Sequence, residues 1–165
     1  MPATTLEDTM ARGDRRLEAA AILEGVARRV PQSSLLADVL AVQSELLGDP
    51  EARKAADIEL FELLRDELDD PQRVLALAAR VLKEATSRDR GALGAWLERI
   101  RSVKTPEKLL PLKARVLAGA LGDQDIDGPE LFTLARDAGL ALTEAGNFDA
   151  ASAVYEKALM PMASR

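Results

Sequence analysis

Residues 139–161, GLALTEAGNFDAASAVYEKALMP, hold two apolar segments separated by a Gly-Asn pair. Ahead of that pair, apolar residues recur three and four positions apart, which is the spacing of one face of an α-helix. They are Leu131, Ala135, Ala138, Leu142 and Ala145. A connection of only a few residues forces the next helix to fold back on the first. The stretch therefore predicts an antiparallel helix hairpin, and with it a fold of packed helices.

Four dipeptides that end in proline mark further helix starts along the chain. They are Asp49-Pro50, Asp70-Pro71, Thr105-Pro106 and, as the weakest case, Gly128-Pro129. An Asp or Thr side chain can accept a hydrogen bond from an unpaired N–H group of the first turn, and proline at the first helical position has no N–H to satisfy. The residue before proline is disfavoured in helical conformation, so each pair also ends the element before it. Pro111 lies inside the segment that follows Thr105 and predicts a kink or a restart there.

Apolar residues between these marks also follow helical spacing. The stripes are Ala52, Ala56, Leu60 and Leu63, then Val74, Ala78, Val81 and Ala85, then Leu93, Trp96, Leu97, Ile100 and Val103. An early helix carries Leu17, Ala20, Leu23, Ala27 and Val30 and is closed by Pro31, and a second carries Leu36, Leu40 and Leu47 and stops at Gly48. We expect about eight or nine helices with short connections. They form a single domain over residues 1–165, in which residues 1–13 are a loose segment or a short N-terminal helix.

The composition removes several classes of chemistry. The 165 residues include no cysteine and no histidine, which excludes disulfides, thiolate and imidazole metal ligands, and every histidine-dependent catalytic triad. Hydrophobic residues make up 47% but aromatic residues only 3%, so the apolar mass is mostly Leu, Ala and Val and favours helices over strands. Gly-rich phosphate loops, the Gly-x-Ser-x-Gly elbow and dinucleotide-binding glycine clusters do not occur. We therefore expect a protein that is not an enzyme and needs no cofactor.

Hydropathy and composition also suggest where the protein works. The sequence has no apolar run of 18 or more residues, and its N-terminal part alternates acidic and basic residues without an apolar signal core. These features predict no membrane insertion and a cytoplasmic location. The abundance of Ala, Leu and Arg is typical of a bacterial source.

The stretch 139–161 resembles a tetratricopeptide repeat (TPR) motif. In that family small residues let the two helices approach, a turn like Gly146-Asn147 joins them, and residues at the places of Ala151, Tyr155 and Ala158 pack the second helix. The tryptophan usual early in the first helix of the family is absent, with Ala135 near its place. The resemblance implies an all-α fold in which antiparallel helix hairpins stack as a short right-handed TPR-like solenoid.

The middle of the chain is also similar to a second repeat family. Residues 49–56, DPEARKAA, and residues 70–79, DPQRVLALAA, resemble the second-helix pattern of HEAT repeats, so the assignment of the middle helices stays open between TPR and HEAT. Both families stack helix pairs, and both leave a groove that usually holds another protein. The expectation of a binding groove does not depend on the choice.

Charge is distributed in three bands along the chain. Residues 45–70 carry 10 acidic and 3 basic residues, residues 80–115 carry 10 basic and 4 acidic ones, and residues 123–156 carry 8 acidic residues against Arg136. The candidate partner-binding residues lie in the basic band and are Arg88, Arg90, Arg99, Arg101, Lys104, Lys108 and Lys113. One interpretation is a surface that recruits an acidic peptide or a phosphorylated segment. The other is that the bands face each other between neighbouring hairpins or are solvated faces, because surface ion pairs are common and individually weak.

The acidic loop and the basic band suggest two further kinds of ligand, a calcium ion and nucleic acid. Residues 123–128, DQDIDG, reproduce the first half of an EF-hand calcium loop through Asp123, Asp125 and Asp127, but the twelfth position, which should be a bidentate Glu, is Leu134. The alternative is an acidic loop whose carboxylates favour the positive N-terminus of the next helix. Nucleic acid is not expected, because the net charge is −6 and no stacking aromatics accompany the basic residues.

These observations predict a non-catalytic protein–protein interaction module, a scaffold or adaptor that binds a partner peptide or helix in a groove between hairpins. The partner is expected to be another protein, with an acidic segment as the form that the basic band favours. A first alternative is a small acidic TPR-type chaperone for a secreted or assembled client, and a second is a weak calcium-binding regulator working through Asp123–Gly128. Stacked helices with exposed end faces often self-associate, so a homodimer is a further expectation.

Overall fold

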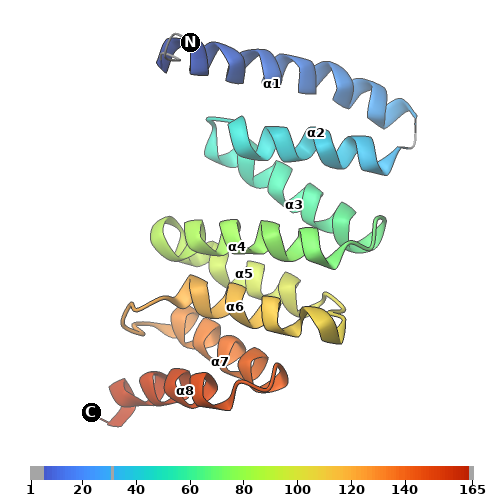
Figure 1. Ribbon diagram of the computed structural model, residues 1–165. Helices are drawn as coiled ribbons and strands as arrows, with labels where there is room; N and C mark the ends of the chain where they lie inside the picture. Colours follow the sequence, from blue (N-terminus) through green and yellow to red (C-terminus); the bar gives the residue numbers. More distant parts are fainter. Residues whose placement is uncertain (1–5, 31, 164–165) are drawn as a thin grey trace, which may run out of the picture. The chain divides into compact units, whose positions relative to one another are not determined.

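The computed structural model describes residues 6–30 and 32–163, and every regular element in that part of the chain is helical (Figure 1). The eight α-helices and one 3₁₀-helix are α1 Leu6–Arg29, α2 Ser33–Leu46, α3 Pro50–Asp66, α4 Pro71–Arg88, α5 Arg90–Arg101, η1 Glu107–Leu109, α6 Leu110–Leu121, α7 Pro129–Glu144 and α8 Phe148–Ala163. The prediction of an all-α fold is confirmed, and the expected number of helices agrees. None of the helices in the described ranges has the length and apolarity to cross a membrane.

The helices divide into two compact units. Unit 1, residues 1–70, contains α1, α2 and α3, and unit 2, residues 71–165, contains α4 to α8. In unit 1 α2 packs against both α1 and α3. In unit 2 α4 packs against α5 and α6, α7 packs against α5, α6 and α8, and η1 packs against α6. The single domain and the right-handed stack expected from the sequence stay predictions.

The core of unit 1 contains a buried polar pair that hydropathy does not reveal. Phe61, Leu40 and Leu64 are almost completely buried, as apolar helix faces require. Beside them the Ser44 hydroxyl donates a hydrogen bond to the Asp57 carboxylate, although both residues are at least 96% removed from solvent. The pairing satisfies groups whose burial alone would be costly, and it joins α2 to α3.

A second polar network links all three helices of unit 1. The Arg28 guanidinium on α1 lies 2.9 Å from the Glu24 carboxylate and 2.8 Å from the Glu59 carboxylate on α3. The Gln43 amide on α2 donates to Glu24 at 3.0 Å. The hydrogen bond from Gln43 is the main cause that lowers the pKa of the Glu24 carboxyl, with Arg28 adding to it and partial burial opposing it.

This network predicts an acid-sensitive part of the stability of unit 1. A carboxyl with a lowered folded-state pKa contributes stability that is present above its unfolded-state pKa, near 4.5, and lost as the pH falls through the folded-state value. We therefore expect Glu24→Gln to reduce the free energy of unfolding at neutral pH and to have a much smaller effect near pH 3. Urea unfolding followed by circular dichroism at both pH values measures this. The control is Glu18→Gln at an exposed position of the same helix, and an equal loss from Glu24→Gln at both pH values would contradict the network.

Helix α1 buries only part of its predicted apolar stripe. Ala20 and Ala27 are 3% exposed and face α2, whereas Leu23 and Val30 are 43% and 47% exposed. The expectation that all five residues form the packed face is wrong for Leu23 and Val30. Residues 6–13, expected to be loose or a separate short helix, belong to α1 from Leu6 onward. Residues 1–5 and Pro31 lie outside the described residues.

The predicted helix starts are confirmed at three of the four proline pairs. Helices α3, α4 and α7 begin at Pro50, Pro71 and Pro129, and the Asp49 carboxylate accepts a hydrogen bond from the Ala52 N–H at 3.3 Å. At the fourth pair the prediction is wrong, because only the 3₁₀-helix η1 follows Pro106 and the Thr105 side chain caps nothing. The restart predicted at Pro111 is confirmed, since α6 begins at Leu110 with the proline in its first turn, where a missing N–H costs nothing.

Helices α7 and α8 form the hairpin expected from residues 139–161. Helix α7 ends in a Schellman turn, in which Gly146 has a φ of +81° and the Asn147 N–H donates to the Leu142 carbonyl at 2.8 Å. The Asn147 side chain then accepts from the Ala150 N–H at 3.3 Å and caps α8. Ala151 and Ala158 are buried against α7, as expected for these positions.

Candidate functional site

A pocket of a size that could receive a partner side chain lies in unit 2, between α5, α6 and α7. Helix α5 is held in place by Asp89, which accepts from the Ala92 N–H at 3.3 Å, and by the buried side chains Trp96 and Leu97. Small buried residues on the facing helices, such as Ala114 on α6 and Ala138 on α7, let the three helices approach closely. Between their larger side chains a pocket of about 280 Å³ remains open to solvent.

The pocket has an apolar floor and a charged rim. The floor is made by Ile100, Leu117, Leu140 and Ala141, and the rim by Arg101, Lys113, Arg136, Asp137 and Glu144. Leu140 is 53% exposed, so the apolar surface extends to the mouth. Such a combination suits a ligand that buries an apolar group and keeps a charged group at the edge.

Electrostatics give the rim a positive balance. The Asp137 carboxylate is only 12% exposed and lies 2.9 Å from the Arg101 guanidinium and 3.7 Å from that of Arg136. Three basic residues thus meet two acidic ones around the opening, a net charge of +1 at neutral pH. No ion pair to Lys113 is found among the described residues, so its ammonium is available to an incoming carboxylate.

The structure places the other predicted binding residues apart from this pocket. The Arg90 guanidinium lies 2.7 Å from the Asp127 carboxylate, and the Arg99 guanidinium lies over the Trp96 ring at 5.1 Å from its centre. Arg88 ends α4, while Lys104 and Lys108 are exposed between α5 and α6. Of the seven residues proposed from the sequence, only Arg101 and Lys113 lie together at the pocket.

Two ion pairs join the basic band to the acidic band that follows it. Arg90 with Asp127 and Arg101 with Asp137 are pairs between the basic band and the following acidic band, as the second interpretation expects. Lys113 lines the pocket, and recruitment of an acidic segment by the basic band stays a prediction. The sequence missed Arg136, Leu140 and Glu144 as site residues. Their spacing of four along α7 was a usable signal for a shared helix face, although not for what that face meets.

The acidic loop 123–128 is tied to α5 and not arranged as a metal cage. Arg90 donates to both the carbonyl and the carboxylate of Asp127, at 3.1 and 2.7 Å. Gly128 has a φ of +96°, so it makes the sharp turn that the motif suggested, while Leu134 at the twelfth position is completely buried. Within residues 6–30 and 32–163 no group of three or more Asp, Glu, His or Cys side chains could hold a metal ion. This geometry gives the calcium alternative no support.

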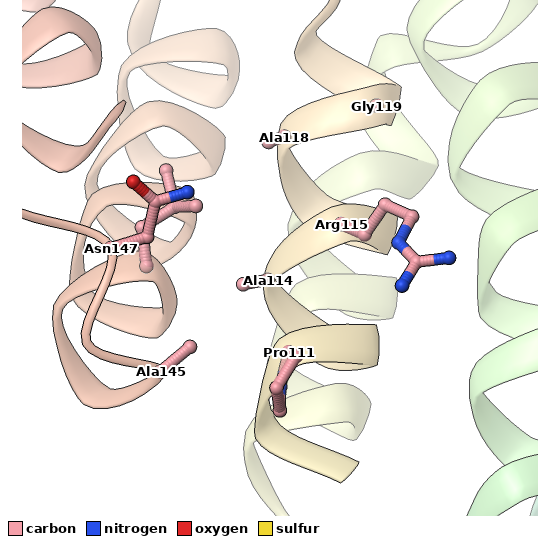
Figure 2. Close-up of a pocket in the computed structure, with 8 residues that line it drawn as sticks. Pro111, Ala114, Arg115, Ala118, Gly119, Ala145 and Asn147 are labelled. Atoms are coloured by element: carbon pink, nitrogen blue, oxygen red, sulfur yellow. The ribbon is translucent and has the colours of Figure 1, made fainter. Parts of the chain in front are cut away.

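A larger and shallower hollow lies on the other side of α6, against the α7–α8 turn. It measures about 630 Å³ and is lined by Pro111, Ala114, Arg115, Ala118, Gly119, Leu142, Ala145 and Asn147. Figure 2 shows Ala114 and Ala118 facing the turn that carries Asn147, while the guanidinium of Arg115 extends to the other side of α6. The lining is mostly small and apolar, and its charged residue, Arg115, turns its guanidinium away from the α7–α8 turn (Figure 2), so this groove offers mainly apolar contact area.

No family model, no curated protein and no solved structure matches this chain.

Proposed function

We propose that this chain is a non-catalytic protein-binding module whose pocket between α5, α6 and α7 receives a partner segment that combines an apolar residue with a carboxylate. The observation that carries the proposal is the position of Lys113 on the rim of a pocket with an apolar floor, without an ion-pair partner among the described side chains. An apolar side chain would enter over Leu117 and Leu140, and its acidic neighbour would meet Lys113 and Arg101.

The architecture supports this proposal. Helix α4 packs on α6 and α5 packs on α7, so helices two places apart are neighbours within unit 2. That pattern is the one expected of stacked hairpins, and we include a short right-handed TPR-like stack in the proposal. Because the pocket is preformed on rigid helices, most of the conformational entropy lost on binding is lost by the ligand. A scaffold or adaptor in the cytoplasm is the role we propose.

Binding of defined peptides tests the proposal. Fluorescently labelled peptides would combine Leu or Phe with Asp or Glu, and the comparison sets would replace the acidic residues with Lys, omit the apolar residues, or carry no charge. We expect the acidic-apolar set to bind best, with an affinity that falls as salt rises. Lys113→Glu should weaken binding about tenfold, because an attractive charge becomes a repulsive one.

The matched control is Lys83→Glu, an identical change at an exposed position of α4 that does not line the pocket. It should leave peptide affinity unchanged. Equal weakening by both variants would assign the effect to net charge and remove the pocket from the proposal. Failure of every peptide set to bind would remove the adaptor function itself.

The chaperone alternative is favoured by one specific observation, the mostly apolar groove of about 630 Å³ between α6 and the α7–α8 turn. It predicts that the uncharged apolar peptides bind best and that Lys113→Glu has no effect. Gly119→Phe, which fills the groove from α6 at a site where an added Cβ meets no atom within 4 Å, should then abolish binding. The same peptide series therefore separates the two functions.

A further inference from the structure

Helix α1 carries an exposed apolar face opposite the one packed on α2. Ile22 is 72% exposed, and Leu23, Val26 and Val30 are between 43% and 48% exposed. At 3.6 residues per turn the four side chains fall within about 100° around the helix axis, so they share one side of the helix. Side chains of this size are usually covered when they form a continuous stripe.

The same side of α1 is basic toward its N-terminus. Arg12, Arg15 and Arg16 are exposed and precede Ala19, Leu23 and Val26 at the same spacing of three and four. Arg29 adjoins the far end of the stripe, also exposed. Glu18 is exposed on this side as well, so the face combines large aliphatic side chains with four arginines and one glutamate, a net charge of +3.

Helix α8 carries a face of the opposite charge. Phe148, Leu159 and Met160 are 65%, 57% and 70% exposed, on the side away from the buried Ala151 and Ala158. Asp149 and Glu156 are exposed on that same side, in line with Met160. Lys157, the basic residue of the helix, is less exposed and follows Glu156 directly, which places it about 100° around the helix from that carboxylate.

We propose that α8 of one copy of this chain docks on α1 of a second copy. Apolar side chains meet apolar side chains in that arrangement, and Asp149 and Glu156 meet the arginines of α1. Pairing α1 with α1 would oppose two arginine clusters, and pairing α8 with α8 would oppose two pairs of carboxylates. Charge complementarity therefore favours the pairing of α1 with α8. This is a heterologous contact, in which each copy contributes the basic face of α1 to one neighbour and the acidic face of α8 to another.

This inference uses none of the residues of the pocket between α5, α6 and α7, so it is independent of the proposed function. In a pair of copies joined by this contact, one α1 face and one α8 face stay uncovered. Further copies can therefore bind until a ring closes or the assembly precipitates. Association should weaken as salt rises, since exposed charges are screened.

Sedimentation velocity on the purified chain and on two charge-reversed variants tests it. The first variant, Arg15→Glu with Arg16→Glu, changes the net charge of the α1 face from +3 to −1, so that both of its faces are acidic. The second variant, Asp149→Arg with Glu156→Arg, has two basic faces. We expect the unaltered chain to associate with rising concentration. Each variant alone should associate at least about tenfold more weakly, because like charges oppose at the contact. An equimolar mixture should associate again, since each variant then finds a complementary face on the other.

The control for net charge is Lys54→Glu with Lys83→Glu, at exposed positions outside both faces, and it should sediment like the unaltered chain. Circular dichroism establishes that each variant is folded. A chain that stays monomeric at every concentration would overturn the proposal, as would a mixture of folded variants that stays monomeric. A dimer that both variants still form would instead show a contact elsewhere, which also overturns it.

Discussion

Phe61→Ala is expected to lower the stability of unit 1 by about 3–5 kcal/mol, the cost of removing a fully buried aromatic side chain and leaving a cavity. Phe61 is 0% exposed and lies in the helix that contributes Leu60, Leu63 and Leu64 to the same core. A unit of this size has little stability to spare. The variant should therefore lose the helical signal of α1 to α3 at a much lower urea concentration.

The expected loss is confined to unit 1, because Asp70 and Pro71 separate two compact units. The single tryptophan, Trp96, belongs to α5 in unit 2. We expect Trp96 fluorescence to report an unfolding transition close to that of the unaltered chain, while circular dichroism shows an earlier loss. Phe148→Ala is the matched control, since its side chain is 65% exposed and its loss should change stability by less than about 0.5 kcal/mol.

Two results would contradict this expectation. Fluorescence and circular dichroism that shift together by the full amount would show one cooperative domain, as the length and composition first suggested. An unchanged circular dichroism transition would mean that Phe61 is not part of a core.

Gly139→Ala is expected to destabilise the α7–α8 hairpin, although alanine is normally the better residue inside a helix. A Cβ at Gly139 would lie 2.5 Å from Cζ of Tyr155 on α8, closer than two carbons can approach. The ring would have to leave the surface of α7, so the variant exchanges a gain in helix propensity for the loss of this contact. We expect a net loss of about 1–3 kcal/mol, the usual cost of overpacking.

Gly119→Ala provides the matched control for that experiment. It is the same substitution inside helix α6, where an added Cβ meets no atom within 4 Å, so it should be neutral or stabilising by up to about 1 kcal/mol. The difference between the two variants measures the contact of Tyr155 with α7. The double variant Gly139→Ala with Tyr155→Ala should lose less than the sum of the single losses. Strict additivity would show that the ring does not pack on Gly139.

Much of the local structure could be predicted because its causes lie within a few residues. The Asp49 cap, the prolines that open α3, α4 and α7, and the turn at Gly146-Asn147 each depend on neighbours along the chain. The prediction of an α-helix start at Thr105-Pro106 was wrong for a reason that is also local. A capping residue specifies a helix start only when the residues after it do not carry a stronger start signal. Pro111 suited a helix start better, and the α-helix begins beside it.

The candidate site was predicted only in part. The charge pattern of the sequence indicates Arg101 and Lys113, which line the pocket. It indicates equally five residues that lie elsewhere, namely Arg88, Arg90, Arg99, Lys104 and Lys108. Charge along the chain does not say which way a side chain points. Arg99 and Arg101 illustrate this, because two residues on one helix fall on opposite sides, one over Trp96 and the other against Asp137.

What the sequence by itself determined is the helical class, most helix boundaries and the hairpin of α7 and α8, since periodicity, capping and turn chemistry act between residues that are close in the chain. Only the tertiary structure decided the buried pair of Ser44 and Asp57, the rim around Lys113, and the exposure of Leu23 and Val30. Arg101 meets Asp137 across 36 positions of sequence. Contacts of that range depend on how helices pack, and packing is set by the summed shapes of many side chains at once.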